Sequence, residues 1–263
     1  MTAVLGIDVG WAAGRKSSAA CRLEWDANAV GWRIVRMGTD AAERQAVLDD
    51  LVGEGVAVCA IDGPLHGSLA VMDRYRLPER LLTRGFGRIG KPGQSNSPTG
   101  RRLNEEANAF ARLVLETGRL APAAFPTAIH PGALAEAFPT SFLGTMMPDG
   151  RVPEHGLRSD VYWSHLTAAA PPPPHDLLTA LLADLLPGRA CAGNLTAVRD
   201  HDERAALVCA LTAAAIAADR YVAVGDGADG YIHLGPWTQP WALEQLHANA
   251  AACGRPEAVV IRR

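Results

Sequence analysis

The chain has 263 residues, of which 48% are hydrophobic and 20% charged, and its formal net charge is −3. These proportions are typical of a globular protein and exclude a disordered or fibrous chain. The sequence contains no uninterrupted apolar stretch of about 18 residues, so we expect no membrane-spanning helix.

The first 62 residues carry the clearest pattern of strands. Apolar runs predict strands at 3–8, 19–25, 32–37 and 56–62, and helical spacing predicts a helix over 40–51. The first three strands favour an antiparallel meander with a hairpin loop at 26–31. The fourth strand returns through a helix, which favours a parallel pairing. The sequence therefore predicts an α/β sheet.

The rest of the chain alternates predicted helices with short strands, and we find no internal repeat. Helices are predicted at 72–84, 101–116, 176–186, 200–218 and 242–252. A short strand and a helix are expected within 125–139, a hairpin over 221–224 and 231–234, a last strand at 258–261, a loop at 85–100 and a proline spacer at 171–174. We expect one domain over 1–263, with a helical and loop insertion around 66–124 and a C-terminal helix–strand extension around 236–263.

Two predicted strands end in an aspartate, Asp8 and Asp62. If these strands are neighbours, both carboxylates lie at the sheet edge where ligands collect in α/β proteins. Two like charges so close are unfavourable, and a divalent cation removes the conflict. Two such ions could activate water for phosphodiester hydrolysis. The alternative is that each aspartate caps the turn that follows its strand.

Residues 73–102 carry eight basic and two acidic side chains. Arg76, Arg80 and Arg84 recur every four residues, which predicts one stripe on a helix. Together with Arg88 and Lys91 they are the predicted contacts to a nucleic-acid backbone, because basic side chains pair with phosphates. The alternative is a solvated helix face followed by a loop.

The sequences GIDVGW at 6–11 and AIDGPL at 60–65 resemble the two signature segments of domain-of-unknown-function family 429, a predicted RNase-H-like nuclease group. The similarity continues in ERLLTRG at 79–85, AEAFP at 135–139 and DERAALVCALTA at 202–213. It covers most of the chain.

This resemblance implies an RNase-H-like mixed sheet, with a three-stranded antiparallel meander plus parallel strands, flanked by helices. It also implies a metal-dependent nuclease that acts on DNA or RNA. Its Mg²⁺ or Mn²⁺ would be held by Asp8, Asp62, Glu136 and Asp202. The chain departs from the family at Ala205, where the second aspartate of the C-terminal helix is expected. That departure leaves the fourth ligand or catalytic competence open.

Two other functions stay open. A non-catalytic nucleic-acid or protein-binding module on a degenerate nuclease fold is consistent with Ala205. The segment 6–10 also looks like the first phosphate segment of the actin and sugar-kinase ATPases, although ATP binding there needs a second half-domain. The five cysteines include no Cys-x-x-Cys pair, which favours reduced thiols and a cytoplasmic location.

Overall fold

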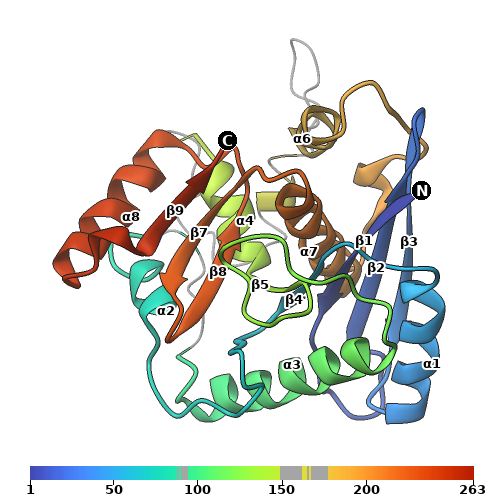
Figure 1. Ribbon diagram of the computed structural model, residues 1–263, viewed down its shortest axis with the longest axis horizontal. Helices are drawn as coiled ribbons and strands as arrows, with labels where there is room; N and C mark the ends of the chain where they lie inside the picture. The colour runs from blue at the N-terminus through green and yellow to red at the C-terminus, as the bar shows by residue number, and fades with distance from the viewer. Residues whose placement is uncertain (88, 90–93, 149–161, 165, 167–176) are drawn as a thin grey trace.

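The computed structural model describes residues 1–87, 89, 94–148, 162–164, 166 and 177–263 (Figure 1). Within these residues one nine-stranded sheet has the order β6-β3-β2-β1-β4-β5-β8-β7-β9. The strands are β1 (Thr2–Asp8), β2 (Ser18–Trp25), β3 (Ala29–Met37), β4 (Cys59–Asp62), β5 (Leu134–Ala137), β6 (Ala190–Cys191), β7 (Tyr221–Asp226), β8 (Gly230–Leu234) and β9 (Val259–Arg262).

The sheet is mixed, as the sequence predicts. Strands β1, β2 and β3 pair antiparallel, so the predicted meander is confirmed. Strand β4 pairs parallel to β1, and β5 pairs parallel to β4. Strand β8 continues in parallel with β5, and β7 and β9 complete that end by antiparallel pairing. The C-terminal extension thus adds β9 to the same sheet.

Helices cover both faces of the sheet (Figure 1). One face packs against α1 (Ala41–Val52) and α3 (Pro98–Glu116), and the other packs against α7 (His201–Ala217), α4 (Pro139–Met146) and α6 (Leu177–Leu185). Beyond β7 and β8 lie α2 (Leu77–Leu81) and α8 (Pro240–Ala252). In the described part of the chain, no helix has the length and apolar character needed to cross a membrane.

An aspartate side chain caps the start of each of two helices. The side chain of Asp40 accepts a hydrogen bond from the Glu43 amide at 2.7 Å. The side chain of Asp200 accepts from the amides of Asp202 and Glu203 at 3.0 and 3.2 Å. These bonds satisfy amide groups that have no partner within the helix, and they explain where α1 and α7 start.

The predicted helix over 72–84 is wrong, because α2 spans only Leu77–Leu81. Arg76 caps this short helix with an extended backbone (φ −74°, ψ 157°), and Pro78 lies in its first turn. Pro78 has no amide hydrogen and its ring would clash with the carbonyl four residues earlier, so the helix does not extend back through residues 72–76. The short strand β6 was not predicted, and the proline spacer at 171–174 lies outside the described residues.

Helix α7 lies unusually close to strand β1, because residue 6 is a glycine. A Cβ atom on Gly6 would come within 2.1 Å of the Ala210 amide nitrogen and 2.3 Å of the Ala206 carbonyl oxygen. The helix is buried along nearly its whole length, which suits its alanine-rich sequence. This contact sets the position of the start of α7 relative to the end of β1.

We expect Gly6→Val to destabilise the protein by at least about 3 kcal/mol, because the new side chain would meet helix backbone that cannot move aside. Urea denaturation followed by circular dichroism measures this change. Gly227→Ala is the matched control, since a Cβ there meets no atom within 4 Å. Equal stability of the two variants would contradict the proposed close packing.

Candidate functional site

The structure places Asp8 and Asp62 side by side at the carboxyl ends of two parallel strands. They are register partners in the β1–β4 pairing. The residues before them, Ile7 and Ile61, pack into the core formed with α1 and α3. Because side chains alternate along a strand, both aspartates point to the other face, toward α7. The charges of both act on buried Cys209 of that helix.

Helix α7 and strand β3 complete this group with a further aspartate pair and an arginine. Arg36 donates from Nη1 to Asp200 Oδ2 at 2.9 Å and from Nη2 to Asp202 Oδ2 at 2.8 Å. Its Nη2 also donates to the carbonyl oxygen of Lys16. Asp202 therefore lies near Asp8 as predicted, but its carboxylate is already paired with a guanidinium.

Arg36 and Asp200 are site residues that the sequence analysis missed. Strand register puts Arg36 beside Ala19, Ala19 beside Asp8, and Asp8 beside Asp62. The four residues thus form one row across four strands on the face covered by α7, and the small alanine leaves space between Asp8 and Arg36. Correct pairing of the predicted meander would have revealed Arg36. Asp200 was predicted only as the first residue of the helix over 200–218.

Burial and mutual repulsion raise the pKa values of the two strand aspartates. Asp8 is 8% exposed, and burial raises its pKa well above 3.8, with further increases from the charges of Asp62, Asp202 and Asp200 and an opposing effect of Arg36. Burial also raises the pKa of Asp62 to about 7, assisted by the charge of Glu136 and opposed by a hydrogen bond with Asp8. The pair therefore favours retaining a proton or acquiring a cation.

Glu136 does not point toward Asp8 as Asp62 does, although it lines a small pocket together with Asp62 and Arg76. On β5, Glu136 is the register partner of Ile61, whereas Ala137 is the partner of Asp62. Glu136 consequently points to the opposite face of the sheet. There it is 2% exposed and forms a two-point ion pair with Arg76, at 2.6 and 2.8 Å. Its Oε2 also accepts from the Leu65 amide at 2.9 Å.

The predicted stripe of phosphate-binding arginines is likewise not formed. Arg76 is fully buried and pairs with Glu79 at 2.8 Å as well as with Glu136, so it ties the segment after β4 to the sheet. Arg80 and Arg84 are exposed, and the Arg84 carbonyl oxygen accepts a hydrogen bond from Asn249 of α8. Arg88 and Lys91 lie outside the described residues.

Across the described residues, no group of three or more His, Cys, Asp or Glu side chains is arranged to hold a metal ion. The predicted set of four ligands is therefore not assembled there. The pair of Asp8 and Asp62 is still suitable, because Mg²⁺ commonly takes one or two protein carboxylates and completes its shell with water. Ala205 is buried and supplies no further oxygen.

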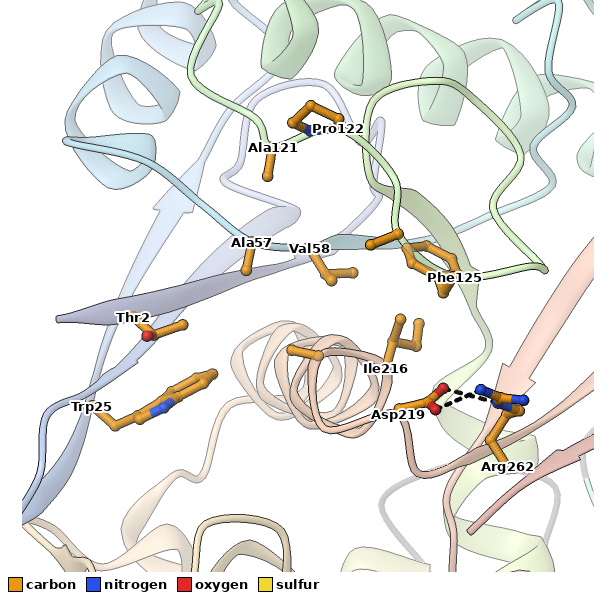
Figure 2. A pocket seen from close by; sticks show the side chains of 12 residues that line it. Thr2, Trp25, Ala57, Val58, Ala121, Pro122, Phe125, Ile216, Asp219 and Arg262 are labelled. Carbon is orange, nitrogen blue, oxygen red and sulfur yellow. Dashed lines mark hydrogen bonds and ion pairs between the residues drawn. The ribbon is translucent and has the colours of Figure 1, made fainter.

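A separate cavity of about 480 Å³ lies near the amino-terminal ends of β1 and β4, opposite the ends that carry Asp8 and Asp62 (Figure 2). Its walls include Trp25, Phe125 and Ile216, and the Asp219–Arg262 ion pair (2.6 Å) stands at one end. None of the predicted site residues lines it. The cavity and the carboxylate pair are thus distinct features of the molecule.

Comparison of the chain with protein-family models, curated proteins and solved structures finds no match. The family resemblance inferred from the sequence accordingly stays a prediction.

We expect Arg76→Met to destabilise the protein by about 3–5 kcal/mol, because it leaves Glu136 and Glu79 buried without their cation. The control is Arg84→Met, which changes an exposed arginine and should alter stability by less than about 0.5 kcal/mol. Urea denaturation of both variants checks this. A stable Arg76→Met variant with weakened nucleic-acid binding would instead support the predicted phosphate contact.

The raised pKa of Asp62 predicts that stability falls as pH rises. Between its ordinary value of 3.8 and its folded value of about 7, the folded state holds more protons than the unfolded state. Asp62→Asn should therefore flatten this fall and increase the free energy of unfolding at pH 8 by about 1–3 kcal/mol. Urea denaturation from pH 4 to 8 in EDTA tests it. Asp50→Asn, at an exposed carboxylate, should leave the slope unchanged.

Proposed function

We propose that this protein is a metal-dependent nuclease of RNase-H-like fold. The order β3-β2-β1-β4-β5 supports the fold, since an antiparallel meander is followed by two parallel strands, as the family resemblance implies. The observation that carries the function is the adjacency of Asp8 and Asp62 at the carboxyl ends of β1 and β4.

Asp8 and Asp62 would hold one Mg²⁺ or Mn²⁺ ion. A divalent cation bound there would lower the pKa of coordinated water and offset negative charge on a phosphodiester. Asp8 and Asp62 would lose their shared proton when the ion binds, and their negative charges would then be balanced. Arg36 would hold Asp200 and Asp202 in ion pairs next to the site, so that neither carboxylate ligates the ion.

A phosphodiester of DNA or RNA is the substrate class that this chemistry favours. Of the phosphate contacts predicted from the sequence, Arg80 and Arg84 are exposed and stay in the proposal, and Arg76 does not. The cytoplasm stays the proposed location, on the evidence of the cysteine pattern.

A non-catalytic binding module is the second candidate. Two ion pairs favour it, Glu136 with Arg76 and Asp202 with Arg36. In each pair an arginine is bound to a carboxylate that a nuclease of this kind would use as a metal ligand. The two candidates differ in whether bound nucleic acid is cleaved.

Calorimetric titration of Mn²⁺, followed by incubation with a panel of DNA and RNA substrates, tests the proposal. The wild type should bind Mn²⁺ and cleave at least one substrate. Asp8→Asn/Asp62→Asn should lose Mn²⁺ binding and reduce cleavage by at least about a hundredfold, since loss of outer-shell partners alone costs 10–100-fold. Asp50→Asn is the control, because that carboxylate is 62% exposed and pairs only with Arg33 among the described residues.

Each other outcome has a definite meaning. Nucleic-acid binding without cleavage by the wild type would favour the binding module. No Mn²⁺ binding by the wild type would overturn the metal site, and Asp8 and Asp62 would then be neighbouring carboxyls that share a proton.

A further inference from the structure

Arg36 occupies the part of the site where a second cation would be expected. Its guanidinium lies between the two aspartates at the start of α7, at 2.9 Å from Asp200 and 2.8 Å from Asp202. The Arg36 side chain is 30% exposed, so solvent and small solutes reach it. It also lies close enough to lower the pKa of Asp8.

The acidic residues around the site fall into two classes according to their cationic partners. In one class, Glu136 forms an ion pair with Arg76, and Asp200 and Asp202 both form ion pairs with Arg36. Among the described residues, no arginine or lysine forms an ion pair with Asp8 or Asp62. Each carboxylate of the first class has an arginine partner, whereas Asp8 and Asp62 have none in the described part of the chain.

A second divalent ion at Asp202 would have to displace a guanidinium that makes two charged hydrogen bonds, or else lie against it with like charge.

We propose that Arg36 replaces a second metal ion, so that this site binds one divalent cation at Asp8 and Asp62. This inference rests on the proposed metal site and adds its stoichiometry and a positioning residue. Arg36 holds Asp202 and Asp200 away from the ion and supplies the second positive charge facing a phosphodiester. Its buried Nε has no hydrogen-bond partner in the described residues.

The test counts Mn²⁺ ions per chain by calorimetry and, independently, by the electron paramagnetic resonance signal of unbound Mn²⁺. The wild type should bind one ion. Arg36→Met, which removes the charge but keeps much of the side-chain length, should bind two, because Asp200 and Asp202 are then released. Arg36→Lys should restore a stoichiometry of one.

Arg33→Met is the matched control. Arg33 belongs to the same strand but lies an odd number of residues from Arg36, so it points to the other face, where it pairs with Asp50 at 2.7 Å. The Arg33→Met variant should still bind one Mn²⁺ ion per chain. Circular dichroism and thermal melting establish that each variant is folded.

The outcomes separate this inference from the proposed function. Two ions in the wild type, or one ion in both the wild type and Arg36→Met, would overturn the role of Arg36 while the metal site stands. No ion in the wild type would overturn both. If Arg36→Met fails to fold, Asp200→Asn/Asp202→Asn provides the test: retention of one ion supports the inference, and a drop from two to one contradicts it.

Discussion

The close contact between helix α7 and strand β1 at Gly6 is the constraint on which the site depends. Because residue 6 has no side chain, the backbone of the helix rests against the strand, with Ala206 and Ala210 at the contact. This packing brings the first turn of α7, with Asp202, to the end of β1, where Asp8 lies. A residue without any functional group thus determines which charged groups meet.

Two arginines form ion pairs with acidic residues, one arginine on each face of the sheet. On the face covered by α7, Arg36 pairs with Asp200 and Asp202. On the other face, Arg76 is fully buried with Glu136 and anchors the chain that follows β4. Asp8 is buried and Asp62 is half-buried, and neither has a cationic partner among the described residues. The pKa values of both carboxyls are therefore raised.

The errors of the sequence analysis have a common physical origin. A repeat of arginines every four residues is the same whether the segment is an exposed helix or a buried turn, so the pattern over 76–84 could not reveal that Arg76 is an interior ion-pair partner. Glu136 was assigned to the metal site by the family resemblance, which does not fix the face of the sheet to which its side chain points. A shift of one residue in register reverses the face to which a strand side chain points, and the sequence contains no record of the β4–β5 register.

The sequence by itself determined the meander and the parallel return of β4, and it indicated that Asp8 and Asp62 meet if β1 and β4 are neighbours. These features follow from local apolar patterns and short connections, which act over a few residues. Only the tertiary structure decided which carboxylates lack a positive partner. Arg36 and Asp202 are 166 residues apart, and Arg76 and Glu136 are 60 apart, so their pairing depends on strand register and helix packing.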